Sequence, residues 1–164
     1  MRRRGFTLIE VLIAVAVIGV LATLVSVAAG NALRQARDVK RKTAVQQLGR
    51  FLASGSCYVP DAGAGDYDMG QLIGELKTKF PQYAQFMGAL PKDPKGGTDA
   101  ETKYRYAVTA DASACALYAN LENKDEPVTL TSLTAPTPGG GNGVLNAAAP
   151  GPNGTTRYVQ AANK

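Results

Sequence analysis

The sequence has no histidine and no tryptophan, and only two cysteines among its 164 residues. Without histidine, a Ser-His-Asp or Cys-His catalytic centre and every histidine-ligated metal site are excluded. Two cysteines are too few for a zinc site made of thiolates alone. The sequence also offers no phosphate-binding loop and no catalytic pair of carboxylates. These absences are weak evidence by themselves, but we expect a protein that is not an enzyme.

The excess of positive charge is concentrated at one end of the chain. There are 18 Lys and Arg residues against 13 Asp and Glu, and three of the basic residues are the arginines at positions 2–4. Without these three, 15 basic residues stand against 13 acidic ones. The overall charge is therefore weak evidence for nucleic-acid binding.

What the chain does contain is one long apolar run, residues 6–29, in which Glu10 is the only charged residue. As a helix these 24 residues would reach about 36 Å, enough to cross a bilayer core of about 30 Å. The arginines before the run predict a cytoplasmic N-terminus and an exported remainder. A secretory signal peptide cleaved at residues 27–29 is disfavoured, because the apolar region of a typical signal peptide spans only about 7–15 residues and the run here is longer. A plain membrane anchor explains the length but leaves Glu10 without a purpose, since a carboxylate in such a span costs roughly 2.5–3.5 kcal/mol.

The segment RGFTLIE, residues 4–10, resembles the processing site of type IV prepilins and the related pseudopilins. The resemblance implies that a membrane-embedded peptidase cuts between Gly5 and Phe6 and methylates the amine of Phe6. It also implies that Glu10 pairs with the Phe6 ammonium of a neighbouring subunit, so that both residues act in assembly. A buried ion pair is costly to leave half-made, and Glu10 would therefore penalise wrong registers between packed helices. The alternative is a carboxylate that snorkels to the membrane surface.

This resemblance organises the chain into four parts. Residues 1–5 are a leader peptide, 6–30 a transmembrane and filament-core helix, and 31–53 an amphipathic continuation of that helix. Residues 54–164 form a globular head. The fold class expected is α+β and pilin-like, with one long N-terminal helix packed on a small antiparallel sheet.

The function implied is that of a structural subunit of a type IV pilus-like filament. Its partners would be copies of itself, the prepilin peptidase, an inner-membrane assembly platform and the membrane before assembly. It would be a single-pass membrane protein at first and an extracellular pilus, or a periplasmic pseudopilus, later. The alternatives are a major pseudopilin of a type II secretion system, a DNA-binding pilin of an uptake system, and a monotopic membrane enzyme.

The second half of the helix shows a helical apolar stripe beside a basic cluster. The stripe, expected to be its buried face, comprises Ala32, Ala36, Val39, Thr43, Ala44, Leu48 and Phe51 or Leu52. The basic residues of the opposite face are Arg34, Arg37, Lys40, Arg41, Lys42 and Arg50. Asp38 is the only acid among them. We expect the basic residues to be solvated or to contact acids of a neighbouring subunit, with DNA phosphates as the alternative.

The head begins with loops and one short helix. Residues 61–68 are rich in Gly and Asp and are predicted to be an exposed loop. Asp68 is a candidate N-cap for a helix over about 69–79, which Pro81 ends. The spacing of the apolar residues 69, 72, 73, 76 and 80 supports that helix.

The rest of the head is predicted to be a small antiparallel sheet. Strands are expected over 104–108 and 114–122, joined by a hairpin loop at 111–113, with a further short strand over 128–133. The patterns Leu-Pro-x-Asp-Pro at 90–94 and Tyr-x-Tyr at 104–106 are similar to those in the heads of type II secretion major pseudopilins and of some simple pilins.

The two cysteines, Cys57 and Cys115, are expected to form a disulfide. One follows the long helix and the other lies in a strand of the sheet that should pack on it. The orientation of the apolar run places both outside the cytoplasm, where disulfides persist. Two buried free thiols are the alternative.

Asp93, Asp99 and Glu101 surround a Gly-rich turn. Relatives of the secretion type can hold Ca²⁺ in a head loop, so these three are candidate ligands. They lack the spacing of an EF-hand, and calcium requires 6–8 oxygen ligands. A solvated turn is the alternative, and no other cofactor or metal is expected.

Residues 135–153 are dominated by Pro, Gly, Ala and Asn. This composition predicts a flexible segment, about 135–154, without a core of its own. Residues 155–160 return to the character of a strand. They could dock on the edge of the sheet, or they could belong to a disordered tail.

Overall fold

The computed structural model describes residues 7–54, 57–85, 88 and 90–163. The chain divides into two compact units, one up to Gln35 and one from Ala36 onward. A single helix, α1 (Leu8–Ser54), contributes to both of them. The predicted cleavage site, Gly5 and Phe6, lies outside the described residues.

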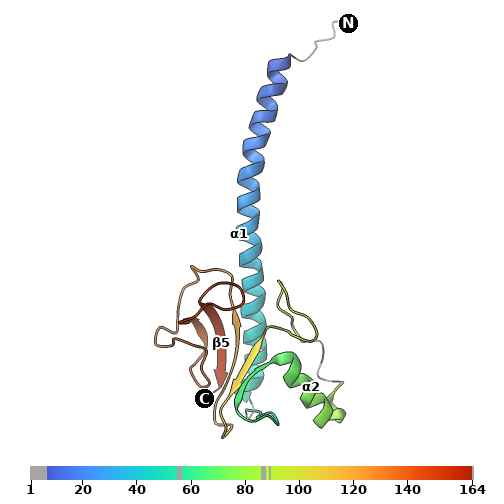
Figure 1. Ribbon diagram of the computed structural model, residues 1–164, viewed down its shortest axis with the longest axis vertical. Coiled ribbons are helices and arrows are strands. Elements are labelled where there is room, and N and C mark those ends of the chain that lie inside the picture. Colours follow the sequence, from blue (N-terminus) through green and yellow to red (C-terminus); the bar gives the residue numbers. More distant parts are fainter. Residues whose placement is uncertain (1–6, 55–56, 86–87, 89, 164) are drawn as a thin grey trace. The chain divides into compact units, whose positions relative to one another are not determined.

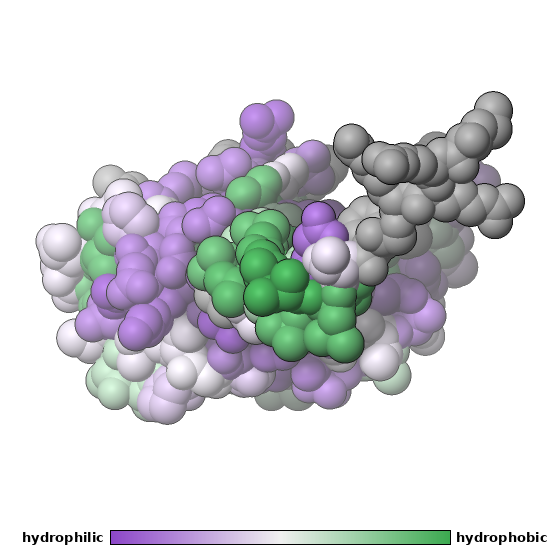
Figure 2. Space-filling model, turned by 90° about the horizontal axis from the view of Figure 1, so that it is seen from above, coloured by the Kyte–Doolittle hydropathy of each residue, from purple (hydrophilic) through white to green (hydrophobic). Residues whose placement is uncertain are grey.

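The first unit consists of the N-terminal part of α1. Every Leu, Ile and Val from Leu8 to Val25 is exposed, over a range of 52% to 83% of its surface. The space-filling view from above shows hydrophobic residues exposed at the surface (Figure 2). Among the described residues, α1 is the one helix long and apolar enough to cross a membrane, judged by length and composition.

The second unit is the last part of α1 together with a five-stranded antiparallel sheet (Figure 1). The strand order is β1-β2-β3-β5-β4. The strands are β1 (Gly65–Asp68), β2 (Arg105–Val108), β3 (Cys115–Asn120), β4 (Gly143–Asn146) and β5 (Arg157–Asn163). Between β1 and β2 lie α2 (Met69–Lys79) and the short 3₁₀ helix η1 (Pro81–Tyr83). The expected α+β, pilin-like arrangement is confirmed.

One face of the sheet forms the core against α1. Tyr106 of β2, Leu117 of β3 and Ala161 of β5 face one another across the register and are buried. From α1, Val45 is fully buried in the same cluster. Gly49 of α1 approaches Ala161 so closely that a Cβ built on Gly49 would lie 2.3 Å from the Cβ of Ala161. Backbone approach at this glycine therefore sets how closely α1 sits on β5.

The start of α2 confirms the expected N-cap. Asp68 is buried, and its carboxylate accepts the backbone N–H of Gly70 at 2.8 Å. The same carboxylate accepts the N–H groups of Thr102 and Lys103, so that it also holds the segment that enters β2. One buried acid thus satisfies donors from two separate segments.

Two predictions for single segments of the head, one of a loop and one of a strand, were wrong. The Gly- and Asp-rich stretch 61–68 contains the edge strand β1, paired with β2. Residues 128–133 form no strand. Instead, the backbone N–H groups of Thr129 and Leu130 both donate to the carbonyl oxygen of Val144 in β4. Pairing partners distant in the sequence decided both cases.

The prediction of a flexible segment at 135–154 was also wrong. It contains β4, whose Leu145 is fully buried, and β5 follows it as an interior strand between β3 and β4. The buried amide of Gln160 accepts the N–H of Thr137 at 3.0 Å and donates to the carbonyl of Gly141 at 2.9 Å. Gly141 has a φ of +90°, which few other residues adopt. The glycine content of this segment is as high as in many disordered segments. Here, however, the glycines allow ordered turns that need a positive φ.

Candidate functional site

The N-terminus of α1 is closed by a capping box between Thr7 and Glu10. The Glu10 carboxylate accepts the backbone N–H of Thr7 at 2.9 Å and the Thr7 hydroxyl at 2.7 Å. In return the N–H of Glu10 points to the Thr7 hydroxyl at 3.4 Å. This is the Thr-x-x-Glu pattern that satisfies free N–H groups at a helix start. From the sequence, Glu10 was predicted to be a partner for an ammonium, with snorkelling to the membrane surface as the alternative. This capping role was missed, although the Thr-x-x-Glu spacing indicates it.

The surface next to this cap is apolar without interruption. Leu8, Ile9, Val11 and Leu12 follow Thr7, and more than half of the surface of each is exposed. Soluble monomers rarely expose a continuous apolar surface of this kind. Such a surface fits a bilayer or a packing of apolar helices.

Cys57 and Cys115 form the expected disulfide, with 5.7 Å between their Cα atoms. Both residues are buried. The bond joins the segment that follows α1 to the central strand β3, so the end of the helix is covalently attached to the sheet.

The helix turns a different face to the head than its apolar stripe predicted. Ala44 and Val45 are buried as core residues, but Val39 is 59% exposed, and Ala36 and Thr43 are exposed too. The first half of the predicted buried stripe was therefore wrong.

The residues that face the head at this level are charged. Asp38 is 2% exposed and Arg41 is 0% exposed. The assignment of Arg41 to an exposed basic face was also wrong. Burial of charge on this scale requires partners.

Arg41 lies at the centre of three carboxylates. Its Nε and Nη2 donate to the two oxygens of Asp93, at 2.5 Å and 3.0 Å. Its Nη1 donates to Asp38 at 2.7 Å and to Glu122 at 2.8 Å. Among the described residues, no buried side-chain nitrogen or oxygen is left without a hydrogen bond. We call these four side chains and that of Arg37 the Arg41 cluster.

Arg37 closes the cluster on its outer side. It binds Glu122 in a bidentate manner, with Nε–Oε1 and Nη2–Oε2 distances of 2.7 Å. Asp38 in turn accepts the backbone N–H groups of Glu122 and Asn123. The cluster thereby connects α1 to the end of β3 and to the turn that holds Asp93.

The cluster lowers the pKa values of two of its acids. Hydrogen bonds from Arg37, opposed by burial and reinforced by Arg41, lower the pKa of Glu122 to about 2. For Asp93, burial raises the pKa and the Arg41 guanidinium lowers it, and the net shift is downward. Both carboxylates are therefore ionised at neutral pH.

The Arg41 cluster was not predicted from the sequence. A signal was present, because Asp38 is the single acid among the basic residues of this helix and precedes Arg41 by one helical turn. The other two acids could not be identified from local spacing, because Asp93 and Glu122 are 52 and 81 positions away from Arg41 in the sequence.

The five basic residues predicted as DNA or subunit contacts have separate environments. Arg37 and Arg41 bind the acids of the Arg41 cluster, and Lys42 pairs with Glu126 of the head. Lys40 is exposed on α1 in the second unit, and Arg34 is exposed in the first. Three of the five thus bind acids of their own chain.

The three candidate calcium ligands are not brought together. Asp93 binds Arg41, and the exposed Asp99 pairs with Lys92 at 2.7 Å. Glu101 is exposed on the same turn. Within the described residues, no group of three acidic or cysteine side chains is placed to hold a metal ion.

Comparison with known families is decisive for the N-terminus. Residues 1–26 match the family described as the prokaryotic N-terminal methylation motif, which is the class III prepilin signal of type IV pilins and pseudopilins. The chain carries a prepilin signal. This prepilin signal implies processing by a prepilin peptidase and assembly into a filament, and it indicates a structural subunit, not an enzyme. Searches of curated proteins and of solved structures found no match to the chain.

Proposed function

We propose that the chain is the structural subunit of a type IV pilus-like extracellular filament. It is made as a prepilin, cut between Gly5 and Phe6, methylated on Phe6, held in the membrane and then polymerised through α1. The observation that carries the proposal is the prepilin signal at residues 1–26, directly continued by an apolar helix with exposed side chains.

The two halves of α1 support this proposal by their different surroundings. The side chains from Leu8 to Val25 are exposed and suit first lipid and then the helices of other subunits. The residues from Arg37 to Gly49 are held to the head by the Arg41 cluster, the apolar core and, just beyond, the disulfide. A subunit pulled by its helix would thus carry its head along without unfolding it.

A periplasmic pseudopilus of a type II secretion system is the second candidate. It is favoured by the pattern Leu-Pro-x-Asp-Pro at 90–94 and by Tyr104 and Tyr106. In this chain Asp93 of that pattern binds Arg41, and both tyrosines are buried in the core. These contacts serve the attachment of the head to the helix, which a pilus and a pseudopilus both need.

A role in DNA uptake receives less support. Arg37, Arg41 and Lys42 are paired with carboxylates of the same chain, and Arg41 is fully buried. A phosphate chain would have to compete with these intramolecular acids. Phosphate contact is therefore left to isolated exposed cations such as Lys40.

The test is an intact mass of the protein in filaments sheared from the cell surface, with Gly5→Leu as the control variant. The expected chain starts at methylated Phe6 and is two hydrogen atoms lighter than its reduced form. The control should stay uncut and absent from the sheared fraction. A mature chain confined to the cell envelope would replace the pilus by the pseudopilus, and an uncut wild-type chain would overturn both.

A further inference from the structure

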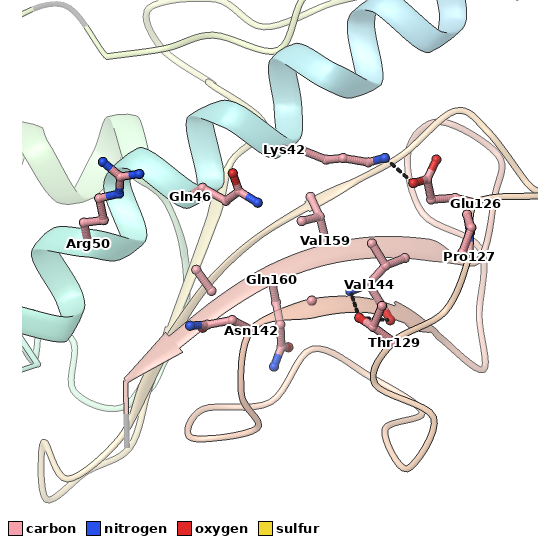
Figure 3. Close-up of a pocket in the computed structure, with 12 residues that line it drawn as sticks. Lys42, Gln46, Arg50, Glu126, Pro127, Thr129, Asn142, Val144, Val159 and Gln160 are labelled. Atoms are coloured by element: carbon pink, nitrogen blue, oxygen red, sulfur yellow. Dashed lines mark hydrogen bonds and ion pairs between the residues drawn. The ribbon is translucent and has the colours of Figure 1, made fainter.

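A cleft of about 550 Å³ opens between α1 and the β4–β5 side of the sheet (Figure 3). Its floor is apolar and comprises Val144, Val159 and Ala161. Val159 points toward α1, while the neighbouring Gln160 points away from it (Figure 3). The helix wall carries Lys42, Gln46 and Arg50, which follow one another at intervals of four residues and so share one face.

The charge on the rim of the cleft is unbalanced. Lys42 is paired with Glu126 on the opposite rim. Arg50 is exposed, and within the part of the chain that the structure describes no carboxylate lies at ion-pair distance from it. The cleft therefore fits an occupant that offers a small apolar group together with negative charge.

The same head carries a segment with this chemistry, the turn Thr98–Glu101. The N–H of Thr98 donates to the carbonyl of Glu101 at 2.8 Å, which closes the turn. It presents Asp99, Ala100 and Glu101 to solvent. Lys92 balances one of the two acids, and the turn keeps a net negative charge. We call this segment the acidic turn.

Other exposed acids of the head fit the cleft less well. Asp61 and Asp66 are paired with Lys79 and Arg105, and Asp111 is hydrogen-bonded to Ser113 in the tight hairpin loop. Asp125 is followed by Glu126, which belongs to the rim of the cleft itself. None of these acids stands beside both a second acid and a small apolar residue in the way that Asp99, Ala100 and Glu101 do.

The cleft and the acidic turn lie at opposite edges of the sheet. The cleft adjoins β4, the last strand in the order, whereas the acidic turn leads into Thr102, which is bound to Asp68 at the end of β1, the first strand. In Figure 1 the strands β4 and β5 and the segment before β2 flank α1 on different sides. A contact between two different patches of identical subunits is heterologous. Such contacts build a ring where the rotation closes and an open helical filament where it does not, so this contact is compatible with a filament.

We propose that the acidic turn of one copy docks into the α1–β4 cleft of the next copy. Ala100 lies on the apolar floor, and Asp99 and Glu101 face Arg50 and the Lys42 end of the rim. This contact rests on the proposed filament function and adds to it a head-to-head interface with a defined polarity.

The first test is disulfide crosslinking in filaments of the full chain. The pair Gln46→Cys and Ala100→Cys should give a ladder of multimers on oxidation. The matched control pair, Gln46→Cys with Gln71→Cys on the exposed face of α2, should give none. Wild-type filaments combined with no ladder from the first pair would overturn the contact while leaving the filament function intact. Unprocessed wild-type chain without filaments would overturn the filament function itself.

The second test is an exchange of charge. Arg50→Glu and Glu101→Lys should each lower the filament yield by about tenfold, because like charges then meet across the contact. The combined variant should recover most of the yield, and the matched control Lys77→Glu should assemble as the wild type does. If Arg50→Glu loses DNA retention and Glu101→Lys does not restore assembly, the cleft binds a nucleic acid and the proposed contact is wrong.

Discussion

Arg41 binds Asp93 through both oxygens of the carboxylate, at 2.5 Å and 3.0 Å, although the two residues are 52 positions apart. Both side chains are buried. The bidentate geometry fixes the orientation of the pair as well as its distance. One residue of the helix therefore determines where the turn before β2 rests on α1.

Removal of the Arg41 guanidinium should destabilise the head strongly. Arg41→Ala leaves the carboxylates of Asp38, Asp93 and Glu122 without their shared cation, and breaking a buried ion pair costs about 3–5 kcal/mol. Urea unfolding of the purified subunit would measure this loss. The adjacent and exposed Lys40→Ala should change stability by no more than about 0.5 kcal/mol. Equal effects of the two variants would show that the cluster does not hold the head.

The stability of the head should fall in acid as Glu122 and Asp93 lose their charge. The pKa of Glu122 is lowered to about 2 from its ordinary value of 4.5, so its contribution to stability is present above about pH 4.5 and is lost as the pH falls toward 2. The lowered pKa of Asp93 acts in the same direction. Urea midpoints between pH 6 and pH 2 should show the decline. Glu122→Gln should reduce its size, and an unchanged decline would contradict the assignment to Glu122.

Two glycines in helices should respond to alanine with opposite signs. Gly49→Ala places a methyl group 2.3 Å from the Cβ of Ala161, and such overpacking costs about 1–3 kcal/mol. Gly74 of α2 has nothing within 4 Å of a Cβ, so Gly74→Ala should stabilise by about 0.5–1 kcal/mol through helix propensity. Thermal unfolding of both variants gives the comparison. A stabilising Gly49→Ala would mean that α1 does not approach β5 this closely.

The disulfide should be stable to reductant while the head is folded. Cys57 is 6% exposed and Cys115 is 0% exposed, so a thiolate cannot reach the sulfur atoms without local opening. Thiol alkylation after incubation with dithiothreitol should label native protein slowly and unfolded protein fast. The double variant Cys57→Ala with Cys115→Ala should lose about 4 kcal/mol, as expected for a closed loop of this length. Equally fast labelling of native and unfolded protein would contradict the burial of the bond.

Glu10 can be tested for its two roles with a single substitution. Glu10→Gln keeps an oxygen that accepts from Thr7, because Gln also completes a capping box, but it removes the charge that an ammonium would need. We expect the variant to insert and to be cut, and to yield few filaments. Thr7→Val, which removes the capping hydroxyl, should cost only about 1 kcal/mol of helix stability. Normal filament yield from Glu10→Gln would assign Glu10 to capping alone.

The sequence alone determined the features that depend on neighbouring residues. The prepilin signal and the apolar run each consist of consecutive residues, so they can be recognised without knowing which distant segments they contact. The helix over 69–79, its cap at Asp68 and the strands around Tyr106 and Leu117 follow from local spacing and turn residues, and they were predicted within a few positions. The disulfide between the two cysteines was predicted as well, because one cysteine follows the long helix, the other lies in a strand expected to pack on it, and both were expected outside the cytoplasm.

The tertiary structure decided which face of α1 meets the head. The hydrophobicity pattern of the helix predicts that Val39 is buried and Arg41 exposed, because the pattern considers only the transfer free energy of each side chain by itself. Asp93 and Glu122 reverse that order by supplying the buried guanidinium with partners from distant segments. Residues 143–146 were also decided by the tertiary structure. Their glycine-rich neighbourhood is typical of a flexible linker, but they form strand β4 because they pair with β5. Where the stabilising partner is remote in sequence, only the folded chain shows the outcome.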